Sequence, residues 1–331
     1  MALARKVRTR LVVIGSSAVV LSLFIAFVLP GLLFPQQPRL SEEIYAELFP
    51  FESRYLELEG GSRIHYVDEG QGPTILLFHG NPASAFLYRH IIAELRADFR
   101  VIAFDYPGFG RSTAPPDFQF TAQEQAETAL QFFDAINPDQ AVIMVQDWGG
   151  PIGFHVAQNR PAQIRGLVVG NTWAWPLAGR FRYEAFSWIM GGPIGRGITS
   201  SRIGVVHLFL KRGVIRPLSN EAYAGYFQTF IDGDRTPVTT FPRELVAAKD
   251  FLAKLENGMA LLHQHETLIV WGEQDFAFGE DFRRRFESYL PKHRTVLLPN
   301  AGHFIQEDAP DVIAQAIREH FGPPPIPTTR D

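Results

Sequence analysis

The sequence contains no cysteine among its 331 residues. This absence excludes disulfide bonds, thiolate metal ligands and a cysteine nucleophile, and it fits an oxidising or a reducing compartment equally well. The chain also lacks a strong charge imbalance, since 31 basic and 35 acidic residues give a formal net charge of −4. No basic patch is dense enough to indicate a nucleic-acid partner. The remaining composition, 46% apolar and 20% charged, is that of a globular protein with a substantial core.

The N-terminus combines a basic flank with a long uncharged apolar run. Residues 1–10 carry four basic side chains, and no charged residue occurs from Leu11 to Phe34. About 20 apolar residues suffice to cross a bilayer as a helix, and a basic flank tends to stay cytoplasmic. We therefore expect residues 11–34 to be a single-pass membrane anchor, followed by a linker over 35–49 and an extracytoplasmic domain. The alternatives are a buried core helix or a cleaved signal peptide, which would leave a secreted or periplasmic protein, although no A-x-A cleavage pattern is present.

After the linker, short apolar runs alternate with helical patterns. A hairpin is expected around Gly60 and Gly61, and near-continuous Val/Ile/Leu runs then include TILLFHG, RVIAFDY, AVIMVQD, GLVVGN, TLIVWGEQD and TVLLPNAGH. Such runs indicate strands covered on both faces, and hence an α/β fold with a mostly parallel sheet between helices. In the last helical pattern, APDVIAQAIREHF, we expect Asp308 as the N-cap and Pro310 in the first turn.

An aromatic-rich segment interrupts this alternation between residues 172 and 257. It contains no strand–helix repeat, so we expect a helical cap inserted over the carboxyl edge of the sheet, where open α/β sheets bind ligands. The core then comprises residues 50–171 and 258–331. Most of the aromatic side chains are expected to form the interior of the cap itself.

Asp147 ends one of the predicted strands and precedes Trp148 and a helix rich in small residues. This is the setting of a nucleophile elbow, in which a tight turn exposes a side chain above the sheet. Serine is the usual residue there, and Val145 also replaces the first glycine of the G-x-S-x-G pattern. An aspartate is ionised at neutral pH, so it can displace a leaving group from a saturated carbon and leave an ester that water can hydrolyse. Asp147 therefore indicates an alkyl electrophile.

Other segments supply partners for this nucleophile. The motif HGNP places Asn81 where such hydrolases take an oxyanion-hole N–H, and the Asn81 amide and Trp148 indole are further donors. Asp275 and His303 follow late strands, and nucleophile, acid, histidine is the chain order of α/β-hydrolases. We expect His303, oriented by Asp275, to activate water. The HQH of residues 263–265 has metal-like spacing but no third ligand, so no metal site is predicted.

Taken together, HGNPASAFLYR, DYPGFGRS, VQDWGGPIG and NAGHFIQED resemble the haloalkane dehalogenases over nearly all of residues 50–321. The resemblance implies an α/β-hydrolase fold that converts a haloalkane and water to alcohol, halide and a proton without a metal or organic cofactor. It also implies that Asn81 and Trp148 bind the halide. The strand after the nucleophile ends at Asn171 rather than at an acid. The chain therefore resembles the subgroup with an Asp-His-Asp triad and an Asn-Trp halide pair, in which self-association to oligomers is an option.

Two other functions fit parts of this pattern. An epoxide hydrolase would use the same aspartate, histidine and acid, with ring-opening tyrosines from the predicted cap: Tyr183, Tyr223 and Tyr226. A membrane-tethered binding protein of the same fold would carry Asp147 as the remnant of a serine site. The acid and histidine in the expected order argue against this last reading.

Overall fold

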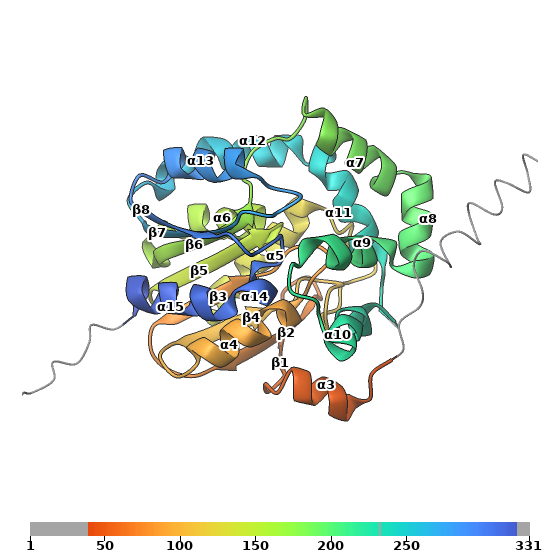
Figure 1. Ribbon diagram of the computed structural model, residues 1–331, viewed down its shortest axis with the longest axis horizontal. Helices are drawn as coiled ribbons and strands as arrows, with labels where there is room; N and C mark the ends of the chain where they lie inside the picture. Colours follow the sequence, from red (N-terminus) through yellow and green to blue (C-terminus); the bar gives the residue numbers. More distant parts are fainter. Residues whose placement is uncertain (1–38, 232, 323–331) are drawn as a thin grey trace, which may run out of the picture.

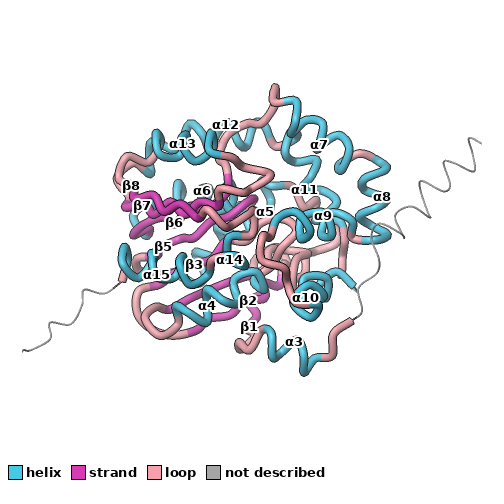
Figure 2. Tube along the Cα trace, in the orientation of Figure 1, coloured by secondary structure: helices cyan, strands magenta, loops and turns pink. Residues whose placement is uncertain are grey.

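The computed structural model describes residues 39–231 and 233–322, and its centre is one eight-stranded sheet (Figures 1 and 2). The strand order is β1-β2-β4-β3-β5-β6-β7-β8. The pairs β1·β2 and β2·β4 are antiparallel, and all other neighbours are parallel, which confirms the predicted mostly parallel sheet. The strands are β1 (Arg54–Glu57), β2 (Arg63–Glu69), β3 (Thr74–Phe78), β4 (Arg100–Phe104), β5 (Ala141–Asp147), β6 (Ile164–Thr172), β7 (Glu266–Gly272) and β8 (His293–Leu298).

The sequence pattern of each strand matches its place in the sheet. Every residue of β5, at the centre, is buried, as expected for a strand covered on both faces. The edge pair β1 and β2 forms the predicted hairpin, whose turn holds Gly60 and Gly61 at φ +94° and +89°. Glycine adopts this left-handed region without a steric penalty, so the two glycines determine where the chain reverses.

Helices cover both faces of the sheet (Figure 1). On one face α4 (Arg89–Leu95) packs against α15 (Pro310–Phe321). On the other, α5 (Ala122–Ile136) packs against α6 (Gly149–Asn159), which also contacts α12 (Lys249–Gly258). Helix α13 (Glu280–Tyr289) joins this layer by aromatic contact with α6. Short 3-10 turns lie at 85–88, 161–163 and 259–262.

The predicted N-cap of α15 is wrong. Asp308 ends the short helix α14 (Ile305–Asp308), and the N-cap of α15 is Ala309, which makes no side-chain cap bond. The Asp308 carboxylate accepts instead from the backbone N–H groups of Gly302, Ile215 and Arg216, at 2.7–3.1 Å. These N–H groups lie in loops and form no hydrogen bond within a helix. The Asp308 carboxylate accepts from them instead of from the first turn of α15. Pro310 does occupy the first turn, as expected.

Between β6 and α12, five helices lie beyond the carboxyl ends of the strands (Figure 1). They are α7 (Phe181–Gly191), α8 (Pro193–Arg202), α9 (Gly204–Gly213), α10 (Asn220–Ile231) and α11 (Thr236–Ala247). The predicted cap range 172–257 thus starts at the end of β6, and its last helix, α12, packs on the core. The first described helix, α3 (Glu42–Leu48), packs on α10.

Buried polar contacts hold the cap to the core. Arg89 of α4 forms two hydrogen bonds with the Glu307 carboxylate, at 2.5 and 2.8 Å, and Tyr226 of α10 donates to the same carboxylate. In α11, the Glu244 carboxylate accepts the Ala122 N–H at the start of α5, at 3.0 Å. Burial raises the pKa of Glu244. Each contact satisfies groups that would be costly to bury alone, so the cap has a defined position over the sheet.

Within the described ranges, no helix is long and apolar enough to span a bilayer. The predicted anchor at 11–34 lies outside those ranges.

Candidate active site

Asp147 lies at a strained turn where β5 ends and α6 begins. Its φ of +51° is in the left-handed region, which non-glycine residues adopt mainly where the surrounding structure enforces it. The Thr172 hydroxyl donates to the Asp147 carbonyl at 2.5 Å. A Cβ on Gly149 would lie 2.0 Å from the Phe78 carbonyl oxygen, and one on Gly80 would lie 2.3 Å from Asp147 Cβ. The small residues around Asp147 therefore allow the close packing of a nucleophile elbow.

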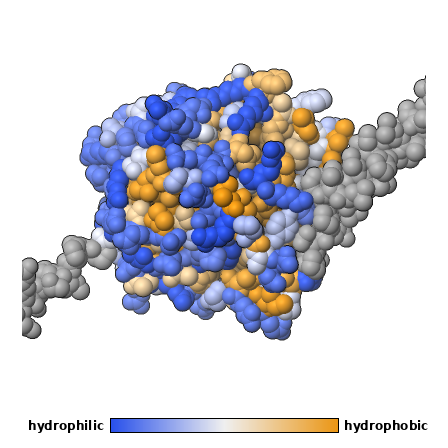
Figure 3. Space-filling model, in the orientation of Figure 1, coloured by the Kyte–Doolittle hydropathy of each residue, from blue (hydrophilic) through white to orange (hydrophobic). Residues whose placement is uncertain are grey.

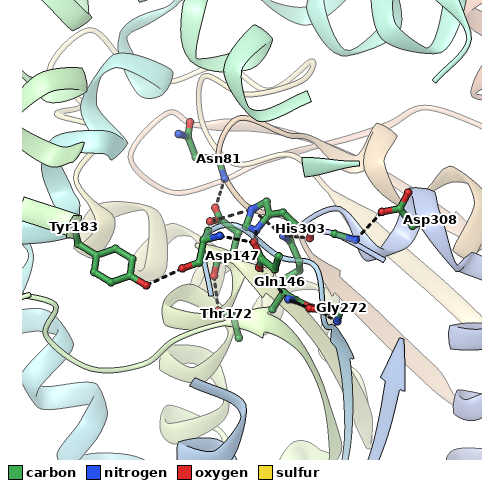
Figure 4. Close-up of polar contacts among 12 residues, drawn as sticks. Asn81, Gln146, Asp147, Thr172, Tyr183, Gly272, His303 and Asp308 are labelled. Carbon is green, nitrogen blue, oxygen red and sulfur yellow. Dashed lines mark hydrogen bonds and ion pairs between the residues drawn. The ribbon is translucent and has the colours of Figure 1, made fainter. Parts of the chain in front are cut away.

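His303 lies between the carboxylates of Asp147 and Asp275, and Figure 4 shows it beside Asp147. Its Nδ1 is 3.1 and 3.2 Å from the two oxygens of Asp275, and its Nε2 is 3.5 Å from Asp147 Oδ2. The side chains of His303 and Asp275 are fully buried. The structure thus brings together the three residues that were predicted from separate segments, with the His303 imidazole between the carboxylates of Asp275 and Asp147.

The two carboxylates determine the charge of the imidazole. Burial by itself would lower the pKa of His303. The negative charge of Asp275, with hydrogen bonds to Asp147 and Asp275, outweighs that effect and raises the pKa from the ordinary 6.5 to about 10. The raised pKa favours the protonated ring, which the two flanking carboxylates stabilise.

Asn81 and Trp148 present N–H groups beside Asp147. The backbone N–H of Asn81 donates to Asp147 Oδ1 at 2.8 Å (Figure 4). Among the described residues, neither the Asn81 side-chain amide nor the Trp148 indole N–H has a protein hydrogen-bond partner, and the Asn81 Oδ1 is buried without one. Trp148 is fixed by edge-on packing against Trp173, with ring centroids 4.7 Å apart. These donors are free to bind an anion.

Asp147 faces a cavity of about 200 Å³ between the sheet and the cap. Its polar floor consists of Asn81, Asp147 and Trp148, and the rest of its lining is mainly apolar. The cap and the loop after β7 supply that lining: Arg182, Tyr183, Phe186, Leu208, Phe209, Arg212, Pro242, Leu245, Phe276, Ala277 and Phe278. The cavity suits a small apolar molecule whose reacting carbon contacts a carboxylate.

Sequence reasoning missed two residues that position the histidine and its acid. The Asn171 amide donates to Asp275 Oδ2 at 2.9 Å and to the Gly272 carbonyl at 3.1 Å, and it accepts the Gly272 N–H at 2.7 Å. Gln146 donates to the His303 carbonyl at 3.0 Å. Gln146 precedes Asp147 in QDWG, and Asn171 lies next to the end of β6. These positions beside the predicted site were the only sequence features that could have indicated a role for the two residues.

The cap tyrosines that could open an epoxide are engaged elsewhere. The Tyr183 hydroxyl donates to the Ala277 carbonyl at 2.7 Å, and the Tyr223 hydroxyl lies 2.9 Å from His207 Nδ1. Tyr226 is buried against Glu307. In the described part of the chain, none of the three donates to the nucleophile. The described part of the chain also contains no group of three His, Asp or Glu side chains that could hold a metal ion.

Known proteins share both the sequence and the fold. Residues 73–310 match the family model described as alpha/beta hydrolase fold. Haloalkane dehalogenase 2 of Mycobacterium tuberculosis is 43% identical over 279 residues, covering 83% of this chain and 97% of that protein. A cis-3-alkyl-4-alkyloxetan-2-one decarboxylase of Shewanella oneidensis is 29% identical, covering 83% and 89%.

Solved structures of haloalkane dehalogenases have a similar fold. The crystal structure of the haloalkane dehalogenase DbeA from Bradyrhizobium elkani has a TM-score of 0.72 at 25% identity, covering 81% of this chain and 97% of that one. With a family model matched over residues 73–310 and a 43% identical relative over most of its length, the chain belongs to the alpha/beta hydrolase family and, within it, to the haloalkane dehalogenases.

Proposed function

We propose that this protein hydrolyses haloalkanes with an Asp147-His303-Asp275 triad and an Asn81-Trp148 halide site. In the first step a carboxylate oxygen of Asp147 attacks the halogen-bearing carbon. The new C–O bond forms as the carbon–halogen bond breaks, and the electron pair leaves with the halide. The Asn81 amide and the Trp148 indole stabilise the departing anion. That both donors border the cavity without a protein partner supports this role.

The second step follows from the charge that the first step removes. An alkyl ester on Asp147 is neutral, so one of the two anions that hold the proton on His303 is lost and the pKa of the imidazole falls. The ring releases its proton to solvent and becomes a base. It then deprotonates a water that attacks the ester carbonyl, while Asp275 stabilises the imidazolium that forms.

The tetrahedral intermediate needs donors for its oxyanion. The Asn81 N–H already lies 2.8 Å from Asp147 Oδ1, and we assign the second position to the Trp148 N–H at the start of α6. Collapse of the intermediate releases the alcohol and restores the Asp147 carboxylate, with one oxygen taken from water. The net products are alcohol, halide and a proton.

The observation that carries this proposal is the buried imidazole, within 3.5 Å of the presumed nucleophile on one side and bonded to a second carboxylate on the other. A serine hydrolase would need the first contact to activate a hydroxyl, whereas an aspartate needs it only to hydrolyse an ester. The arrangement therefore fits displacement at an alkyl carbon followed by ester hydrolysis.

The test is to trap the ester. His303→Ala, treated with 1-bromobutane, should release one halide per protein and carry a butyl group on the peptide that contains Asp147, detected by mass spectrometry. The matched control is the double variant Asp147→Asn/His303→Ala, which should release no halide and gain no mass. If no short bromoalkane or iodoalkane leaves an adduct on His303→Ala, the covalent mechanism is refuted.

The substrate panel should include an epoxide and an oxetan-2-one beside the haloalkanes, because one relative is named a decarboxylase of such lactones. Epoxide opening requires a proton donor on the ring oxygen, and the one cap tyrosine that lines the cavity, Tyr183, already donates to Ala277. We therefore expect halide release and little diol.

We also propose that residues 11–34 anchor the protein in a membrane, with the catalytic domain on the extracytoplasmic side. The uncharged run and the basic residues before it support this placement.

A further inference from the structure

Helices α7 and α8 expose an unusual set of large apolar side chains. Phe181 is 83% exposed, Trp188 80%, Ile194 70% and Ile189 55%, and we refer to these four residues as the cap patch. Figure 3 shows hydrophobic surface gathered on this side of the molecule, over α7 and α8. Single exposed apolar residues are common, but contiguous ones mark a surface that contacts a membrane or another protein.

Helix α7 is apolar on two opposite faces. Phe181 and Trp188 are seven residues apart, two helical turns, and therefore lie on the same outer side. Tyr183 and Phe186 line the cavity on the inner side. A surface helix normally presents polar side chains on its outer side, so an outer Phe and Trp indicate a contact with a partner. Within the described residues nothing covers Phe181 and Trp188, so the outer side of α7 is available to a partner.

The path of the chain into the domain indicates which partner. The Leu40 N–H donates to the Gln228 side chain of α10 at 3.0 Å, and the Gln228 amide donates back to the Leu40 carbonyl at 3.4 Å. The chain therefore enters the domain on the cap. Only residues 35–39 separate Leu40 from the end of the proposed anchor, and fully extended they span about 20 Å. An anchored domain must hold this side of the cap close to the bilayer.

Helix α8 belongs to the same side of the molecule as the entry point. Arg235, which precedes α11, donates to the Ser200 carbonyl of α8 at 2.6 Å and to the Phe230 carbonyl of α10 at 2.9 Å. Arg235 therefore connects α8 to α10, the helix to which Leu40 is bonded. Arg182 and Arg196 flank the patch in sequence and both are exposed; the Arg182 guanidinium also borders the cavity and donates to the Ala277 carbonyl at 3.3 Å.

We propose that the cap patch docks on the surface of a lipid bilayer that contains anionic phospholipids. Trp and Phe on one side of a helix, with arginines beside them, is the composition of helices that insert into the headgroup region. The arginines would pair with anionic headgroups. The proposal rests on the proposed anchor but not on the proposed chemistry. Its consequence is that α7, whose inner side lines the cavity, lies between that cavity and the bilayer in which apolar haloalkanes dissolve.

The absence of native cysteine allows a direct test on the full chain. Trp188→Cys and Ile194→Cys each accept one environment-sensitive fluorophore, and Val312→Cys on α15 is the matched control, since Val312 is 44% exposed on a core helix. Each labelled protein is reconstituted in nanodiscs of phosphatidylcholine and phosphatidylglycerol. Quenching is then measured with aqueous iodide and with spin-labelled lipid.

Labels at 188 and 194 should shift to the blue and be quenched by the lipid probe. Their iodide quenching should be at least about threefold weaker than at 312, because interfacial side chains lie about 5–10 Å below the headgroups. Equal iodide quenching at 188 and 312, in protein that elutes with the nanodiscs, overturns docking and leaves the anchor intact. Protein that elutes apart from the discs overturns both. Protection that appears in detergent alone and grows with protein concentration overturns docking in favour of a second copy. Halide release by each variant, measured separately, reports whether the proposed chemistry survives.

Discussion

Removing the charge of Asp147 should make the His303 imidazole far less basic. Nε2 and Asp147 Oδ2 are 3.5 Å apart, and the Asp147 side chain is 7% exposed. At an effective dielectric constant of about 20, two unit charges at this distance interact by about 5 kcal/mol. With about 1.4 kcal/mol per pKa unit, Asp147→Asn should bring the pKa of His303 from about 10 down toward 7.

The measurement is an NMR titration of ¹⁵N-histidine protein, which follows the His303 ring nitrogens from pH 5 to 11. Asp281→Asn is the control, because Asp281 is exposed, pairs with Arg180 and removes the same formal charge. It should leave the His303 pKa where it is. An Asp147→Asn protein whose imidazole still titrates near 10 would refute the reasoning, since it would show that Asp275 alone holds the proton.

The same shift has a consequence for folding. A histidine whose pKa is higher in the folded than in the unfolded protein stabilises the fold below pH 6.5 and loses that contribution as the pH rises through about 10. In Asp147→Asn the loss should end near pH 7 instead. Urea unfolding at pH 6, 8 and 10 should therefore show a stability that falls with pH in the parent protein and is nearly flat above pH 8 in the variant.

Three further outcomes are expected from the same geometry. Trp148→Phe keeps an aromatic ring but removes the indole donor. A hydrogen bond to an anion contributes about 1.5–3 kcal/mol, so kcat/KM for a chloroalkane, measured by halide release, should fall roughly 10- to 100-fold. An unchanged kcat/KM would exclude the indole from halide binding. Asn171→Asp places a second carboxylate where the amide now lies 2.9 Å from Asp275, so the pH–rate profile should lose activity at neutral pH, and a profile that matches the parent would count against the positioning role. Glu307→Gln leaves Arg89 buried without its anion, which should lower the free energy of unfolding by about 3–5 kcal/mol in urea titrations, and a change below about 1 kcal/mol would mean that the pair is compensated by solvent.

The residues that sequence reasoning identified share one property: their position in the chain determines their position in space. Asp147 ends β5, and Asp275 and His303 lie in the loops after β7 and β8; these strands are parallel, so the three side chains meet at the carboxyl edge of the sheet. The sheet and the helical nature of the cap follow from local patterns in the same way. The roles of these residues stay predictions, because similarity to known dehalogenases establishes the family and not the step that each side chain performs.

What could not be predicted depends on contacts between distant loops. Asp308 has the sequence of an N-cap, but backbone N–H groups from the loop after α9 hold its carboxylate. Tyr226 was a candidate proton donor from its place in the cap, yet it is buried against Glu307. No periodicity or spacing encodes such pairings, because each one depends on how the cap helices settle on the core.

Asn171, the penultimate residue of β6, donates to Asp275, which lies in the loop after the neighbouring strand β7 and is bonded to His303. Because the two side chains are in contact, we expect that either position can carry the acid that orients His303, provided that the other position carries a neutral donor. An exchange of the two side chains, Asn171→Asp with Asp275→Asn, should recover turnover at neutral pH that each single change reduces. The same fold can therefore hold the acid that orients His303 at either of two positions.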